Sequence, residues 1–267
     1  MTESRLVKAL LRVASGGVLA FLYLPLAVLA IYAFNDSRIQ AWPPVSFSLR
    51  WFGDVAANPA VAKAVVNSLI AGGAATIIAL VLGTLAALAV HRHRFFGRET
   101  VSFLLVLPIA LPGVVTGIAL QRTFKTFDID LGLMTIVAGH ATFCVVIVYN
   151  NVIARLRRLP GSPEEASGDL GADMWTTFRR ITAPRLGTAL LSGALLAFAL
   201  SFDEIIVTNF TAGAGNQTIP LWILTAIQRP NELPVVNVVA TLLILVSIIP
   251  VWLAQRLAGA ETTGARL

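Results

Sequence analysis

Two adjacent carboxylates, Asp203 and Glu204, lie within an otherwise apolar stretch at residues 186–210. An ionised carboxylate in the middle of a membrane span costs about 2.5–3.5 kcal/mol, even on lenient insertion scales. Such acids attract a cation on a transport path, pair with an arginine, or bind backbone amides at a helix break. We favour a substrate role for at least one of them. Thr208 and Asn209 either line the same path or form hydrogen bonds between helices.

Other residues that could carry chemistry are sparse. His140 is surrounded by apolar residues, and we expect it to form an interhelical hydrogen bond. Cys144 is the single cysteine, so the chain forms neither an internal disulfide nor a cysteine-based metal cluster. A Walker A loop requires G-x-x-x-x-G-K-[ST] to bind phosphates, and none of Lys8, Lys63 and Lys125 follows a glycine. We therefore expect no nucleotide hydrolysis and no bound cofactor or metal in this chain.

The composition around these residues is typical of a membrane protein. Of 267 residues, 57% are apolar and 13% are charged, whereas a soluble domain carries about 25% charged residues. Six stretches are nearly free of charge, and most are long enough for a bilayer, which takes about 20 helical residues. Backbone groups in lipid need internal hydrogen bonds, so these stretches are predicted to be helices. They cover residues 13–35, 64–90, 100–121, 131–154, 186–210 and 233–255.

The placement of lysine and arginine predicts the orientation of the spans. With the N-terminus in the cytoplasm, that side carries 14 basic residues, including six in the loop 155–185, against 6 on the other side. We therefore predict that both termini are cytoplasmic and that residues 1–267 form one membrane domain. The net charge of +6 arises in these loops and not on an exposed basic face, which argues against binding of nucleic acid.

Prolines and aromatic residues add detail to this pattern. Pro108 and Pro112 interrupt the third span, which favours a kinked pore helix or a simple bend. In the external segments, Trp42-Pro43-Pro44 and Trp51-Phe52 are predicted to lie at the headgroup level, where Trp is enriched.

The cytoplasmic loop 155–185 carries the clearest local signal. Ser162-Pro163-Glu164-Glu165 predicts a helix start, with Ser162 as the cap and Glu165 completing an S-x-x-E capping box. A glycine inside a helix costs about 1 kcal/mol relative to alanine, so the small residues that follow require a close partner or a break. The segment therefore predicts a short, exposed helix, ending in Trp175 and Phe178, that inserts into a groove of a cytoplasmic partner. Its small residues are Ala166, Ser167, Gly168, Gly171 and Ala172.

This loop resembles the cytoplasmic signature of ABC importer permeases, which is EAA, three residues, Gly, nine residues and I-x-L-P. Glu165-Ala166-Ser167 is followed after three residues by Gly171, and after nine more by Ile181-Thr182-Ala183-Pro184. Ser167 and Ala183 depart from the signature. The resemblance implies an all-α membrane protein with the type I importer permease fold and six transmembrane helices. It also implies that the small residues above, with Glu165 and Trp175, form the coupling helix that docks on the ATPase.

A second resemblance concerns residues 192–204, SGALLAFALSFDE. They are similar to spermidine/putrescine permeases, which commonly show Ser-Phe-Asp followed by a second acid. This implies import of a polyamine or similar small cation across the bacterial inner membrane. The implied partners are a second homologous permease, a cytoplasmic ATPase dimer that binds ATP and Mg²⁺, and an extracytoplasmic substrate-binding protein.

Other readings remain open from the residues alone. An ion-driven secondary transporter would use Asp203, Glu204 and His140 as relay groups, but it does not explain the spacing in the segment 165–184. A membrane receptor would use the loop to contact a signalling partner and would move no substrate. Within the importer class, Fe³⁺ or another small solute also suits the acidic pair. Co-purification of a Walker-type ATPase separates an importer from the first two classes.

The orientation is testable by labelling single cysteines from each side of the membrane. A cysteine at Ser162 should react only from the cytoplasmic side, and one at Ser46 only from outside, because the basic residues divide 14 to 6. The reverse labelling pattern would overturn the orientation. Labelling of both positions from one side would change the number of spans between them.

Overall fold

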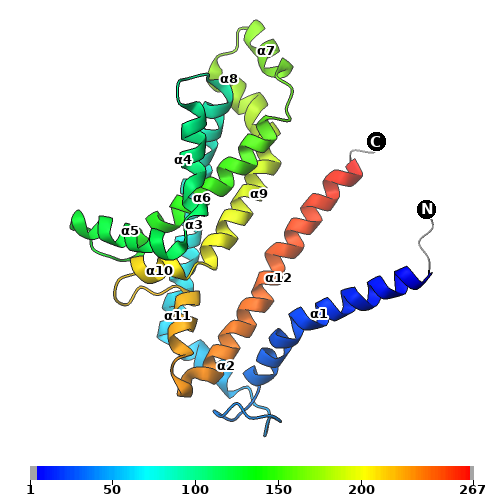
Figure 1. Cartoon of the computed structure of the whole chain (residues 1–267), viewed down its shortest axis with the longest axis vertical. Helices are drawn as coiled ribbons and strands as arrows, with labels where there is room; N and C mark the ends of the chain where they lie inside the picture. Colours follow the sequence, from blue (N-terminus) through cyan, green and yellow to red (C-terminus); the bar gives the residue numbers. More distant parts are fainter. Residues whose placement is uncertain (1–4, 265–267) are drawn as a thin grey trace. The chain divides into compact units, whose positions relative to one another are not determined.

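The computed structural model of the protein describes residues 5–264, with side chains as far as residue 248. The regular elements in this range are helices, joined by loops and one isolated β-bridge (Figure 1), which confirms the all-α prediction. The chain forms two compact units. Within the described range, the first contains residues up to 61 and from 223 onward, and the second contains residues 62–222.

The first unit is built from α1 (Arg5–Ala33), α2 (Arg50–Ala57) and α12 (Leu233–Gly264). Its buried cluster joins Trp51 of α2 to the end of α1 and to α12. The indole N–H of Trp51 donates to the backbone carbonyl of Asn35 at 2.9 Å, and only 3% of the residue is exposed. The ring of Trp51 thus packs inside the unit, where its polar N–H finds a partner.

The second unit is centred on α3 (Pro59–Arg92), α6 (Leu133–Leu156) and α9 (Ala183–Phe202). Alanines on one face of α3 join a buried cluster with residues of α6 and α9. A Cβ on Gly83 would lie 2.9 Å from the carbonyl oxygen of Val145 and 3.0 Å from the amide nitrogen of Tyr149. The absence of a side chain at Gly83 thus lets the backbones of α3 and α6 approach closely, as is usual between membrane helices.

The third predicted span, 100–121, is not one helix. It consists of α4 (Arg98–Ala110) and α5 (Gly113–Thr126), which are bent by 104° at the break between them. Leu111 is extended because it precedes Pro112, and a residue before proline disfavours the helical region. Pro108 stays inside α4. The break is therefore sharper than the predicted kink, and it occurs at Pro112.

The number of spans follows from this geometry. Five helices in the described range are long and apolar enough to cross a membrane, or six if α4 and α5 form one span. Two short helices, α10 (Ile206–Thr211) and α11 (Ile219–Ala226), and the 3₁₀ turn η2 (Pro230–Glu232) lie between α9 and α12. The prediction of a single helix over 186–210 is wrong, since α9 ends at Phe202.

Replacing Gly83 by alanine should destabilise the protein, because the added methyl group meets backbone atoms of α6. We expect a loss of about 1–3 kcal/mol, the usual cost of overpacking a tight contact. Gly73→Ala is the matched control, since it lies on the same helix and a Cβ there meets nothing within 4 Å. Thermal unfolding of both variants in detergent measures the difference. Equal melting temperatures would contradict the close approach at Gly83.

Candidate docking loop and acidic break

The predicted site residues lie in two groups at opposite ends of α9 (Figure 1). One group precedes the helix, in the loop 155–185 that is predicted to contact a partner. The other follows it, at the two acids. With 20 residues, α9 separates the groups by roughly 30 Å, given a rise of about 1.5 Å per residue.

The loop before α9 contains α7 (Ser162–Asp169), α8 (Met174–Thr177) and the π-helical turn η1 (Phe178–Thr182). The predicted cap at Ser162 is wrong, because its side chain makes no capping hydrogen bond and Gly161 is the capping residue. The carbonyl of Gly161 accepts from the amides of Glu164 and Glu165 at 2.9 and 3.2 Å. The helix thus starts one residue earlier than the capping box would place it.

The predicted single helix is divided at Gly171. This glycine has φ +79°, a left-handed conformation that side chains with a Cβ rarely adopt, and it follows the end of α7. A Cβ on Gly168 or on Gly171 would meet nothing within 4 Å. Backbone conformation therefore explains Gly171, whereas no contact within the described chain accounts for Gly168.

Most of the predicted coupling residues face outward. Glu165, Ala166, Gly168 and Gly171 are exposed, and Ala172 is half-buried. The side chain of Trp175 is 65% exposed, and its ring stacks on Phe178 with centroids 5.8 Å apart. These residues form what we call the docking surface.

Ser167 differs from the other predicted coupling residues because it is buried. Its hydroxyl forms a hydrogen bond with the hydroxyl of Thr177 at 2.9 Å, joining α7 to α8. Asp173 caps α8 by accepting from the amide of Thr176 at 2.9 Å. Hydrogen bonds from Thr176 lower the pKa of the Asp173 carboxyl below its ordinary value. The carboxylate is therefore ionised at neutral pH, the form that accepts hydrogen bonds at a helix N-terminus.

Three side chains that no motif assigned to a functional site connect this loop to α3. Arg92, at the end of α3, forms an ion pair with Glu164 of α7, with the guanidinium nitrogen 2.7 Å from the carboxylate oxygen. The hydroxyl of Thr182 donates to the other oxygen of Glu164 at 2.6 Å and accepts from Arg92 at 2.9 Å. In the sequence, Arg92 contributes only to the count of basic residues that predicts the orientation of the spans. No spacing rule connects two residues that are 72 apart in the chain.

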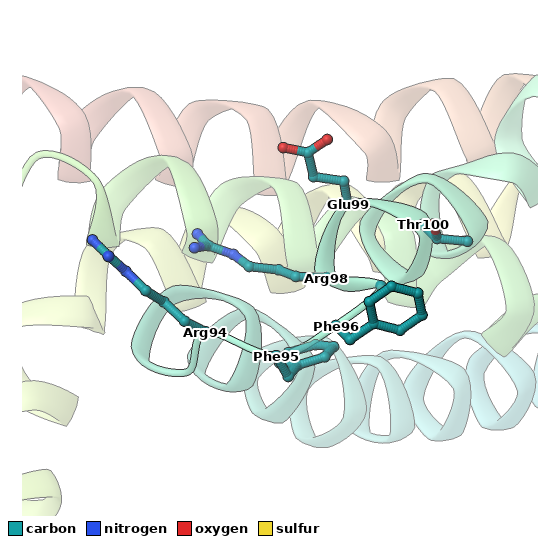
Figure 2. Close-up of a pocket in the computed structure, with 7 residues that line it drawn as sticks. Arg94, Phe95, Phe96, Arg98, Glu99 and Thr100 are labelled. Atoms are coloured by element: carbon teal, nitrogen blue, oxygen red, sulfur yellow. The ribbon is translucent and has the colours of Figure 1, made fainter.

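The turn after α3 carries an open pocket of about 810 Å³. Its lining residues run from Arg94 to Thr100 and are drawn in Figure 2. The guanidinium groups of Arg94 and Arg98 extend in the same direction, while Glu99 points elsewhere (Figure 2). Neither arginine forms an ion pair with a described residue, in contrast to Arg92.

At the far end of α9, the two acids have different environments. Asp203 caps the C-terminus of α9 through its backbone N–H, while its exposed carboxylate makes no hydrogen bond or ion pair with a described residue. Glu204 is half-buried, and its carboxylate accepts from the amide of Val207 at 2.9 Å in the first turn of α10. A carboxylate is favourable at a helix N-terminus because free amides point towards it. Glu204 therefore fills the break between the two helices.

His140 of α6 binds both sides of this break. Its Nδ1 lies 2.6 Å from the hydroxyl of Ser201 in α9, and its Nε2 lies 2.8 Å from the hydroxyl of Thr208 in α10. The Thr208 hydroxyl donates to the carbonyl of Glu204 at 2.8 Å, so it accepts from Nε2–H. Ser201 then donates to Nδ1. The predicted interhelical hydrogen bond is confirmed.

The two polar residues predicted beside the acids also differ. Thr208 is fully buried and is occupied by the bonds to Glu204 and His140. Asn209 is exposed on α10. Of the four residues proposed for a substrate path, Asp203 and Asn209 are therefore the two with exposed side chains, whereas Glu204 and Thr208 hold the break together.

In the described range, the helices include several apolar spans, one of them broken, and a loop of small residues lies between α6 and α9. Residues 79–260 match the family described as the binding-protein-dependent transport system inner membrane component. The chain is 37% identical over 232 residues to the putrescine transport system permease protein PotI of Escherichia coli K12, covering 84% of this chain and 82% of PotI. It is 32% identical over 248 residues to the spermidine/putrescine permease protein PotC of the same strain, covering 92% and 93%.

The fold is shared with a solved structure of a bacterial ABC transporter that imports the acidic polysaccharide alginate. The TM-score is 0.76 at 17% identity, over 96% of this chain and 99% of the other. The protein therefore belongs to the family of binding-protein-dependent transport permeases, and it is an integral protein of the bacterial inner membrane.

Replacing His140 by leucine should destabilise the region around the break. The buried hydroxyl of Ser201 loses its partner, which costs about 1–3 kcal/mol for an unsatisfied buried group. His140→Gln keeps a donor and an acceptor and should recover part of the loss, whereas His91→Leu, at an exposed position, serves as the neutral control. Thermal unfolding in detergent compares them, and an unchanged melting temperature for His140→Leu would count against the bridging role.

Proposed function

We propose that the chain is a permease subunit of an ATP-driven importer that moves polyamines or similar small cations into the cytoplasm. The observation that carries this proposal is the exposed carboxylate of Asp203 at the end of α9, which forms no ion pair with a described residue. A carboxylate at this position favours a positively charged substrate. The names of the two relatives compared above, permeases for putrescine and for spermidine/putrescine, support the same substrate class.

The proposal includes partners, because a permease of this family does not supply the energy for transport. We infer a second permease subunit, identical or homologous, a cytoplasmic ATPase dimer that holds ATP and Mg²⁺, and an extracytoplasmic binding protein. The family description names a binding protein. One similar solved structure, at a TM-score of 0.72, is of an alginate ABC transporter in complex with its periplasmic protein.

The docking surface on α7 and α8 would receive the ATPase. Its residues have the properties of a helix that enters a groove: open space around Gly168 and Gly171, and a large exposed aromatic side chain at Trp175. Glycines that face no atom of their own chain leave room for a partner's backbone. Exposed tryptophan is also enriched among residues that dominate protein interfaces.

The two acids would have separate roles in this importer. Asp203 would attract the cation, because a carboxylate without a partner keeps its full charge for an incoming ammonium group. Coulomb energy rises as the effective dielectric falls, to about 4 kcal/mol at 4 Å when the dielectric is 20. Glu204, already bonded to α10, would hold the break that leaves Asp203 outside a helix. Asn209 would line the same path.

Asp203→Asn is expected to reduce uptake of putrescine or spermidine by about tenfold at low substrate, since tenfold corresponds to about 1.4 kcal/mol of lost attraction. The measurement is uptake per assembled complex after reconstitution with the ATPase and the binding protein. Glu204→Gln should instead lower the stability of the complex along with uptake. Asp130→Asn, at an exposed acid outside this region, controls for net charge.

Two outcomes would contradict the proposal. If Asp203→Asn transports at the wild-type rate at all substrate concentrations, this acid does not select the substrate. If neither putrescine nor spermidine stimulates ATP hydrolysis by the wild-type complex with its binding protein, the importer carries a different substrate class.

A further inference from the structure

Arg92, Glu164 and Thr182 form a closed ring of polar contacts among three elements. The carboxylate of Glu164 accepts from Arg92 through one oxygen at 2.7 Å and from Thr182 through the other at 2.6 Å. Arg92 also donates to the Thr182 hydroxyl at 2.9 Å. Each of the three side chains therefore contacts the other two, and α3, α7 and η1 meet at this point.

This ring differs from an ordinary surface ion pair. Thr182 is fully buried, and the side chains of Arg92 and Glu164 are 24% and 29% exposed. The pair Arg50–Asp36 is longer, at 3.7 Å, and its side chains are 51% and 41% exposed. Exposed ion pairs of that kind contribute little to stability. Charged groups that are partly buried lose contact with water, so they depend on hydrogen bonds and ion pairs with protein groups instead.

The position of the ring along the chain gives it a mechanical consequence. The loop containing α7 and α8 is covalently joined to α6 on one side and to α9, through η1, on the other. Helix α3 ends 70 residues before α7 begins, so no short covalent link joins them. The ring supplies a direct polar connection from α7 to α3.

Neighbouring glutamates in α7 face in different directions as a result. Glu164 turns towards its own chain and completes the ring, while Glu165 is exposed on the docking surface. A partner bound at Glu165 and Trp175 would therefore hold a helix whose other side is fastened to α3. One short helix would then connect the partner to α3 as well as to the covalently attached α6 and α9.

We propose that Arg92, Glu164 and Thr182 are positioning residues that fix α7 to the end of α3, so that displacement of the docking surface moves α3 together with α9. The inference rests on the proposed function, since it takes the docking surface as the ATPase contact. Without the ring, the ATPase would still bind, but its motion would reach α3 only through side-chain packing, and hydrolysis would drive less transport.

The test uses the complete reconstituted complex and compares uptake with ATP hydrolysis. Arg92→Gln and Glu164→Gln should each lower the amount of putrescine transported per ATP hydrolysed by about threefold or more, within the usual range of coupling between contacting residues. ATPase retention on purification should stay close to wild type. Arg94→Gln and Glu99→Gln are the matched controls, because both residues are exposed, lie near Arg92 in sequence and form no ion pair with a described residue.

The reversed pair, Arg92→Glu with Glu164→Arg, separates positioning from folding. It restores opposite charges at the same place and should recover at least half of the lost transport per ATP. If the single variants lose the ATPase altogether, recovery by the reversed pair still supports the ring. Failure of the reversed pair to recover either quantity, or a wild-type ratio in both single variants, overturns the proposal.

A second measurement does not depend on the ATPase. Hydrogen–deuterium exchange of the full-length permease in lipid nanodiscs should show faster exchange of the α7 amides in Arg92→Gln than in Arg94→Gln. Equal exchange of the α7 amides in Arg92→Gln and Arg94→Gln would also overturn the proposal. The proposed function fails differently: Trp175→Ala would then retain the ATPase as well as wild type does, whatever the result at Arg92.

Discussion

Polar groups within apolar helices must find partners inside the protein, and this requirement shapes the end of α9. The helix stops at Phe202, where free backbone groups would be costly in an apolar environment. Glu204 accepts from an amide of α10, and His140 connects the last turn of α9 to Thr208. These bonds let the chain leave the helical path, and they allow Asp203 to remain exposed without a partner in the described chain.

The same requirement explains why α6 is the central helix of the second unit. It meets α3 where Gly83 lacks a side chain, and it carries His140 to the break. Its apolar residues join those of α3 and α9 in one buried cluster. Small residues and a few satisfied polar groups are the usual means of joining helices in a membrane, because apolar burial alone favours no particular neighbour there.

The two candidate functional regions therefore lie on a shared framework. At one end of α9, side-chain bonds hold α7 and α8 in a defined arrangement and leave their small and aromatic residues exposed. At the other end, a break in the helix exposes a single carboxylate. In the proposed importer, this framework would join the surface that receives the ATPase to the carboxylate that attracts the cation.

The sequence alone determined the membrane class, most of the helical spans and the position of the loop along the chain, because these depend on composition and local spacing. The Glu165 to Pro184 spacing and the run before Asp203 also indicated the family that the comparisons establish. Only the tertiary structure decided that α9 ends before Asp203, that Trp51 is buried, and that Glu164 turns inward while Glu165 faces out. Each of these depends on a partner elsewhere in the chain, such as Arg92 for Glu164. The periodicity of the sequence does not reveal such partners.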